Sequence, residues 1–223
     1  MVLAPNYPPN LDDLAAHSNQ PQLPAAFCRY LWERENLDSD IPTHTIPIDD
    51  CPNFYGKIRV HHSAVARFYA PSNVCGAGGM CHERIHSMPC WQNEYPRCDT
   101  VFVETNADVP GMQGMVIGHV LLFISFLYQG ACHDCAFINW LVIHGDSPDP
   151  ETGLWVVKPE YMGNRRTVAL IPMDCIARGA HLLPVYSAAT PLPATFHFAC
   201  SLDVFQAFFV NRFVDHHAHE FVY

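Results

Sequence analysis

Two cysteines form the motif in the sequence that most resembles a metal-binding motif. Cys132 and Cys135 stand two residues apart in Cys132-His133-Asp134-Cys135, and thiolates at that spacing can occupy adjacent corners of a zinc tetrahedron. No second pair with this spacing follows, and the motif lies inside a predicted strand. We therefore predict free thiols and no bound metal, and keep a zinc-binding domain, structural or hydrolytic, as the alternative. Other potential ligands, whose spacings match no finger or ribbon, are Cys75, Cys81, Cys90, Cys98, His82 and His86.

A glycine-rich stretch from Cys75 to Met80 could cradle phosphate through its backbone N–H groups. It contains neither the GxGxxG pattern nor the Gly-Lys-Ser/Thr ending of a nucleotide-binding loop. We therefore predict an ordinary tight turn, followed by a short helical stretch that Pro89 ends.

Three acidic side chains, Asp146, Asp149 and Glu151, could together approach a hard cation such as calcium. Their spacing does not match an EF-hand loop, and Pro148 and Pro150 favour a rigid, solvated turn. No metal is predicted at this loop.

Histidines gather at two places without forming a catalytic arrangement. In His61-His62-Ser63, neighbouring side chains of a strand point to opposite faces, so His62 and Ser63 are not expected to form a dyad. We predict that the chain is not an enzyme and has no cofactor. The second group, for which we expect only adventitious metal affinity at the end of a predicted helix, consists of His216, His217 and His219 with Asp215 and Glu220.

Four aromatic residues lie in or beside the predicted strands of the middle region: Tyr128, Trp140, Trp155 and Tyr161. Two or three such rings at one mouth would hold a cation or a peptide. Packing inside the core is the alternative use of the same rings. These four residues are the candidate ligand-binding set.

Periodicity predicts the elements that must position these side chains. A helix is expected over 24–36, where Phe27, Tyr30 and Leu31 form an apolar stripe; this segment is an arm or a docked helix. Gln129-Gly130 predicts a hairpin turn between two long strands. A last helix is expected from Ser201, with Leu202, Phe205, Phe208, Phe209 and Phe213 on one face. Strands are expected at 57–70, 97–104, 115–128, 131–143, 154–157, 167–171 and 181–186.

Charge and composition limit the classes of function. The net charge is −10, of which residues 1–50 contribute −6 through eight acidic and two basic side chains. The sequence contains no local basic run, which disfavours nucleic-acid binding. With no signal peptide at the N-terminus, the ten cysteines indicate a reduced, intracellular protein. The most apolar run, 115–128, is too short to span a bilayer, so we expect a soluble chain with no membrane partner.

The predicted fold class is α+β and mainly β, with a small antiparallel barrel-like core. Residues 1–54 are expected to form an acidic, proline-rich N-terminal arm with one short helix. Residues 55–200 form the β-rich core, and residues 201–223 form a C-terminal helix packed on it. The oligomeric state stays open.

A series of motifs between about residues 55 and 223 resembles proteins encoded by fungal transposable elements of the Plavaka type. In that family such a region follows the transposase core, and no RNase H-like catalytic domain stands ahead of it here, so no catalytic residue is carried over. The resemblance implies an interaction domain of a transposon-derived protein, located in the nucleus. The matching segments are 61–72, 78–80, 83–85, 100–104, 149–157, 174–186 and 201–220.

A looser similarity in strand order connects the chain with the bromo-adjacent homology (BAH) domain, a β-rich barrel of chromatin proteins. It is based on 99–103, a long strand from Gly118, a strand ending in Trp140, and 176–185. The similarity implies protein or histone-tail recognition only as a hypothesis, because one fold hosts many functions and no aromatic cage can be demonstrated from sequence. A DNA-binding accessory domain of a transposase is kept as a further alternative.

Overall fold

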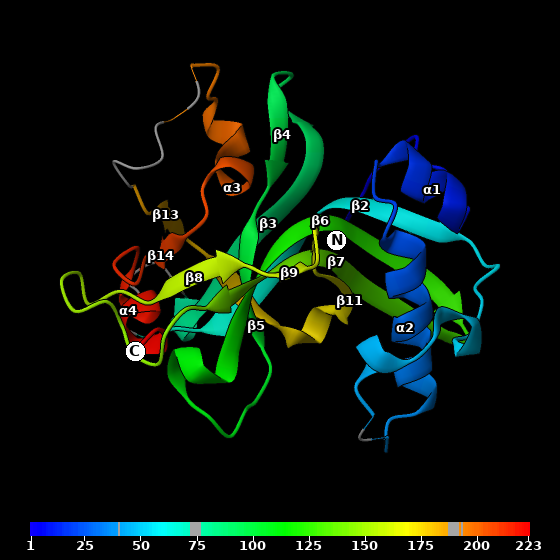
Figure 1. The fold of residues 1–223 in the computed structure, drawn as a ribbon, viewed down its shortest axis with the longest axis horizontal. Coiled ribbons are helices and arrows are strands. Elements are labelled where there is room, and N and C mark those ends of the chain that lie inside the picture. Colours follow the sequence, from blue (N-terminus) through cyan, green and yellow to red (C-terminus); the bar gives the residue numbers. More distant parts are fainter. Residues whose placement is uncertain (40, 72–76, 187–191, 193) are drawn as a thin grey trace.

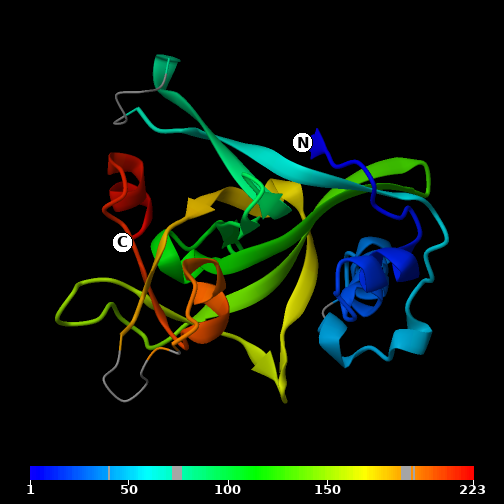
Figure 2. The ribbon, with the colours of Figure 1, turned by 90° about the horizontal axis from the view of Figure 1, so that it is seen from above.

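The chain folds into a long antiparallel sheet with few helices, as the computed structural model shows for residues 1–39, 41–71, 77–186, 192 and 194–223 (Figure 1). The predicted class, α+β and mainly β, is confirmed. Helices α1 and α2 lie at one end of the sheet, and α3 and α4 lie at the opposite end (Figures 1 and 2). No helix among the described residues combines the length and the apolar character that crossing a bilayer requires.

Fourteen strands and four α-helices are assigned within these residues. The strands are β1 Val2–Leu3, β2 Ile58–Tyr69, β3 Met80–Trp91, β4 Tyr95–Cys98, β5 Thr100–Glu104, β6 Met115–Tyr128, β7 Ala131–Ile143, β8 Val156–Pro159, β9 Tyr161–Met162, β10 Arg165–Arg166, β11 Val168–Pro172, β12 Ile176–Ala180, β13 Leu182–Pro184 and β14 Phe208–Val210. The helices are α1 Leu11–His17, α2 Leu23–Glu35, α3 Ser201–Val204 and α4 His216–Phe221, with 3-10 turns η1 Thr43–Thr45, η2 Ile48–Asp50, η3 Ala77–Gly79, η4 Gly111–Gly114, η5 Met173–Cys175 and η6 Phe198–Cys200.

The sheet is open, which corrects the predicted barrel-like core. Its main path runs β13-β14-β8-β7-β6-β2-β3-β4, and all pairings are antiparallel. Four short strands extend it: β1 pairs with β2, β11 pairs with β7, and β5 lies between β6 and β12. Within the described residues the two end strands, β13 and β4, do not pair with each other, so the sheet is not closed into a barrel.

The hairpin between β6 and β7 lies at the centre of the sheet and follows from local sequence. Gln129 and Gly130 have φ values of 49° and 82°, the left-handed pair that a two-residue hairpin turn needs. The turn sets Tyr128 opposite Ala131. From this register Phe123 and Phe137 point into the interior and are fully buried. The predicted hairpin is confirmed.

Helix α2 is docked on the sheet and is not a free arm. Pro24 lies in its first turn, where the missing N–H costs no intrahelical hydrogen bond. Phe27, Tyr30 and Leu31 are all buried, as the predicted apolar stripe requires. The Phe27 ring centroid lies 4.5 Å from that of Phe126 on β6 and 4.7 Å from that of Phe54. The N-terminal segment is therefore part of the core.

Two predicted helices are wrong. The segment after the glycine-rich turn forms strand β3, whose register places Ile85 opposite Ala64 of β2. The segment from Ser201 is helical for one turn only and then forms strand β14, paired with both β13 and β8. Sheet pairing therefore overrides local helix propensity, because neighbouring strands satisfy the backbone N–H and C=O groups of these segments.

Candidate functional site

A groove of about 520 Å³ is lined by residues of helix α2 and of strand β11. One wall is a single face of α2, in which the lining positions follow the i, i+3, i+4, i+7 spacing of a helix. The other wall is an unbroken stretch of strand, Thr167 to Ile171. The helix wall consists of Ala26, Arg29, Tyr30 and Glu33, and the groove is also lined by Thr43, His44, Trp140, Glu160, Tyr161 and Met162.

Strand β11 is an edge strand. Within the described residues it pairs only with β7, from Val168 opposite Asn139 to Pro172 opposite Cys135. Further along, the same side of β7 pairs with β8 instead, and β8 is covered in turn by β14. The sheet therefore continues past β8 but ends at β11, on the side that faces the groove.

The β9–β10 hairpin projects from the sheet between β8 and β11 and forms one end of the groove. Its base is closed by the Thr167 N–H, which donates to the Glu160 carbonyl at 2.9 Å. The Trp140 N–H donates to the Thr167 carbonyl at 3.1 Å, and the Glu160 N–H donates to the Trp140 carbonyl at 3.0 Å. Trp140 and Glu160 are thus directly opposed on neighbouring strands, so their side chains share one face of the sheet.

The structure brings two of the four predicted aromatic residues to the groove. Trp140, half-buried, and Tyr161, 56% exposed, both line it. Tyr128 lies elsewhere, at the end of β6, where its hydroxyl donates to Glu35 Oε1 at 2.6 Å. Trp155 is buried in the core near the C-terminus, and its indole N–H donates to the Tyr223 carbonyl at 3.3 Å. The four predicted aromatic residues therefore do not form one binding site.

The charged side chains of the groove differ in whether they already have hydrogen-bond or ion-pair partners. Glu33 Oε1 accepts a hydrogen bond of 2.8 Å from the Thr43 hydroxyl, which ties η1 to α2. Arg29 Nε is buried without a hydrogen-bond partner among the described residues. The Glu160 carboxylate has neither a hydrogen bond nor an ion pair within the same part of the chain. The groove thus offers one carboxylate beside the Trp140 ring and one cation on the opposite wall.

Tyr30, in the helix wall of the groove, is a poor candidate for acid–base chemistry. Its hydroxyl shares a hydrogen bond of 3.1 Å with His133 Nδ1. Burial raises the pKa of the Tyr30 hydroxyl well above its usual value. Burial likewise lowers the pKa of His133, so both groups stay neutral at pH 7 and serve as a hydrogen-bonded pair.

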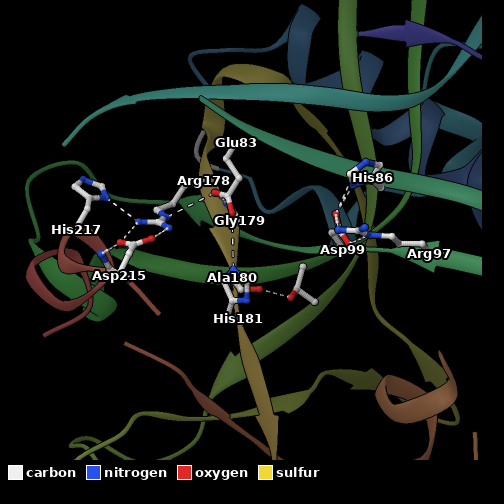
Figure 3. A network of polar contacts seen from close by, with 12 residues as sticks. Glu83, His86, Arg97, Asp99, Arg178, Gly179, Ala180, His181, Asp215 and His217 are labelled. Atoms are coloured by element: carbon white, nitrogen blue, oxygen red, sulfur yellow. Dashed lines mark hydrogen bonds and ion pairs between the residues drawn. The ribbon is translucent and has the colours of Figure 1, made fainter. Parts of the chain in front are cut away.

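A second polar cluster centres on Arg178 of β12, which is 2% exposed (Figure 3). Its guanidinium donates from Nη1 to Asp215 Oδ1 at 3.1 Å and from Nη2 to Oδ2 at 2.6 Å, a two-pronged pair. Nη1 also donates to His217 Nδ1 at 2.9 Å, and Phe68 of β2 lies under the cation at 4.7 Å. Glu83 Oε2 of β3 lies 3.8 Å from Nε. The cluster therefore connects three strands with α4.

The carboxylates of this cluster are held in their charged form. The hydrogen bonds from Arg178 lower the pKa of Asp215 to about 2, and the carboxylate also accepts the Ala218 N–H that begins α4. Burial alone would raise the pKa of Glu83, but hydrogen bonds from His181 and the Gly179 N–H, together with Arg178, lower it. Carboxylates that are held ionised by hydrogen bonds and a neighbouring cation stabilise the fold and are unsuited to proton transfer.

A neighbouring ion pair joins β3 to the segment before β5. Asp99 Oδ2 accepts from both the backbone N–H and Nδ1 of His86, at 2.8 and 3.0 Å. Asp99 Oδ1 accepts from Arg97 Nε at 2.9 Å, and the Arg97 cation lies 4.6 Å from the Trp91 ring (Figure 3). Among the described residues, no serine or cysteine side chain is hydrogen-bonded to His86.

The predicted metal candidates do not converge. Cys132 is exposed and Cys135 is buried, because residues three apart on strand β7 point to opposite faces. Burial raises the pKa of the Cys135 thiol to about 12, which opposes the thiolate form that zinc needs. In the described part of the chain, no three His, Cys, Asp or Glu side chains are placed to hold one ion, and all nine described cysteines are free thiols.

The remaining motifs have local structural partners. Asp149 accepts hydrogen bonds from the side chain and N–H of Thr152, which lower its pKa, in a turn of the 146–151 loop. Ser63 Oγ accepts from Arg84 at 3.2 Å rather than pairing with His62. The histidines 216, 217 and 219 stand within α4, not at the end of a long helix. Of the glycine-rich stretch, Cys75 and Gly76 lie outside the described residues, and Ala77–Gly79 is a turn before β3.

His119, a half-buried histidine, is expected to make stability depend on pH. Burial lowers the pKa of His119, on β6, from 6.5 to about 4. Below pH 6.5 the unfolded chain binds a proton that the folded chain refuses, so stability is full above pH 6.5 and falls towards pH 4. We expect a loss of up to about 3 kcal/mol across this window. Urea unfolding at pH 7 and pH 4.5 measures it, and a His119→Gln chain that loses as much stability as the wild type would contradict the assignment.

No family model, curated protein or solved structure matches this chain.

The residues that sequence reasoning missed are those of the groove walls. Arg29 and Glu33 were within a predicted helix, but only the helical spacing with Ala26 and Tyr30 would have indicated a common face. Glu160 carries no local signal, because it becomes a neighbour of Trp140 only through strand pairing. Arg178 was one of several dispersed cations and is instead the centre of a buried network.

Proposed function

We propose that this chain is a non-catalytic interaction domain that binds a basic peptide segment of a partner protein in the groove between α2 and β11. The observation that supports it best is the opposed pair Trp140 and Glu160 at the groove, an aromatic ring beside a carboxylate without a partner in the described residues. A lysine or arginine side chain placed there would gain both an ion pair and contact with a ring.

The charge of the whole chain favours the same partner. A net charge of −10, with −6 in the first fifty residues that include α2, attracts basic segments and raises their rate of association. The resemblance to transposon-encoded proteins and the looser one to BAH domains support a chromatin protein as the source of such a segment. Histone-like tails are basic and extended, which is the chemistry that the groove accommodates.

Selection from a random dodecapeptide library displayed on phage tests this proposal with the full chain as bait. We expect the selected peptides to be enriched in lysine or arginine, because the Glu160 carboxylate gives up its bound water only in exchange for an ion pair with a cation. Fluorescence anisotropy of the selected peptides should then show affinity reduced about tenfold by Trp140→Ala and by Glu160→Gln, a loss of roughly 1.4 kcal/mol for each.

Tyr55→Ala is the matched control, because Tyr55 is 91% exposed and does not line the groove. It should leave peptide affinity unchanged, whereas Tyr161→Ala should weaken binding. The proposal fails if no peptide is selected above background, or if the selected peptides bind the Trp140→Ala and Glu160→Gln chains as tightly as the wild type.

A further inference from the structure

We infer that the groove holds its peptide as an additional β-strand on the free edge of β11, with apolar and basic side chains alternating along the peptide. This inference rests on the proposed function and adds the binding mode and the pattern of the ligand. It is drawn from the hydrogen-bonding direction of β11, from the two faces of its edge and from the charges on each face.

The outward backbone groups of β11 belong to Val168 and Leu170. The Trp140 N–H donates to the Thr167 carbonyl, so these opposed residues occupy a hydrogen-bonded position of the antiparallel ladder, while the Thr167 N–H and the Trp140 carbonyl bond to Glu160. Such pairs alternate with pairs that point away from each other. Ala169 therefore bonds to β7, whereas the N–H and C=O groups of Val168 and Leu170 point toward the groove.

Pro172 is consistent with this assignment. It follows Leu170 by two residues, so its nitrogen also belongs to the free edge. Proline lacks an N–H and is tolerated in a strand where no ladder bond is required of that atom. The open edge of β11 thus offers two residues, Val168 and Leu170, with complete sets of donors and acceptors, and proline ends it.

The groove reaches both faces of this edge. Val168 and Leu170 turn their side chains toward α2 and pack in the same cluster as Phe27 and Tyr30. Ala169 turns to the opposite face and packs in the cluster that Trp140 joins. All of the stretch 167–171 lines the groove, so an added strand would place alternate side chains on these two faces.

The two faces differ in chemistry, which defines the pattern of the ligand. On the α2 side, the added strand meets Ala26, Tyr30 and Leu170, which suit apolar side chains, and the oppositely charged Arg29 and Glu33. On the other side it meets Trp140 and Glu160, which suits lysine or arginine. A helix beside an exposed strand edge is an arrangement in which main-chain bonds supply affinity and alternate pockets supply specificity.

A fluorescein-labelled decapeptide of alternating lysine and valine tests the inference by anisotropy with the full chain. Val168→Pro removes one outward N–H and should weaken binding at least tenfold, whereas Val168→Ala, which keeps the N–H, should weaken it less than threefold. Circular dichroism establishes whether the proline chain is folded. Because proline also changes the strand itself, modified peptides supply a second measurement.

Two modified peptides carry N-methyl groups either on all valines or on all lysines. A strand offers alternate N–H groups to one neighbour, so one methylated peptide should lose binding and the other should keep it. Loss with methylated valines indicates an antiparallel strand, and loss with methylated lysines a parallel one. Equal effects of the two modifications, or no binding of the unmodified peptide, would overturn strand addition.

These outcomes are distinct from failure of the proposed function. Phage-selected peptides that need Trp140 and Glu160 but ignore Val168→Pro leave the groove as a basic-peptide site and remove only the strand. Sedimentation shows whether a second copy of this chain occupies the edge of β11 instead. A wild-type dimer that Val168→Pro converts to a monomer would indicate such pairing and would also overturn the inference.

Discussion

Replacing Arg178 by methionine is expected to lower the free energy of unfolding by about 3 kcal/mol, the lower end of the cost of removing one partner from a buried ion pair. Arg178 is 2% exposed, and its two carboxylate partners, Glu83 and Asp215, have side chains 25% and 30% exposed. Partial contact of these carboxylates with water keeps the cost near that lower end. Urea unfolding followed by tryptophan fluorescence measures the loss.

The arrangement of the network makes this prediction specific. Asp215 loses its two-pronged partner, and the start of α4 loses an anchor, because the same carboxylate accepts the Ala218 N–H. The double variant Arg178→Met with Asp215→Asn should therefore cost less than the sum of the two single changes. Arg67→Met is the control, since Arg67 lies exposed on β2 and should change stability by no more than about 0.5 kcal/mol.

Additive effects of the two changes would show that Arg178 and Asp215 do not stabilise each other. A loss for Arg178→Met no larger than for Arg67→Met would show that the buried cation is not held by these contacts. Low pH gives an independent comparison, because Asp215 has a pKa of about 2. Its contribution is present above its ordinary pKa of 3.8 and is lost as the pH falls towards 2.

Phe27→Ala is expected to have the other large effect, a loss of roughly 3–5 kcal/mol. The Phe27 side chain is fully buried between Phe54 and Phe126, and these rings dock α2 on the sheet. The cavity would loosen α2 from β6 while the β6–β7 hairpin keeps its own pairing. We expect earlier cleavage within residues 23–35 in limited proteolysis, in addition to the lower unfolding midpoint.

The same change should weaken peptide binding, because α2 forms one wall of the groove. Phe27→Leu keeps most of the volume and should cost about 1 kcal/mol with little effect on binding. Phe213→Ala is the surface control, since Phe213 is 65% exposed. A Phe27→Ala chain with wild-type stability would mean that the helix is not docked through this ring.

Local sequence was sufficient for the elements that depend on neighbours along the chain. The long strands β2, β6 and β7 follow from apolar and alternating runs, and the turn at Gln129-Gly130 follows from its need for left-handed φ values. Helix α2 follows from its apolar stripe. The prediction was wrong for β3 and β14, where pairing with strands distant along the chain decided the secondary structure.

The candidate site depended on tertiary structure far more than the fold did. The sequence by itself determined a β-rich, acidic chain whose rings could bind a ligand, because composition and periodicity are properties of the chain. Only the tertiary structure decided that Trp140 and Tyr161 share a groove while Trp155 is buried, and that Glu160 opposes Trp140. It also decided that β11 is left as an edge, because strand register joins residues that are distant along the chain and no local pattern specifies which edge stays unpaired.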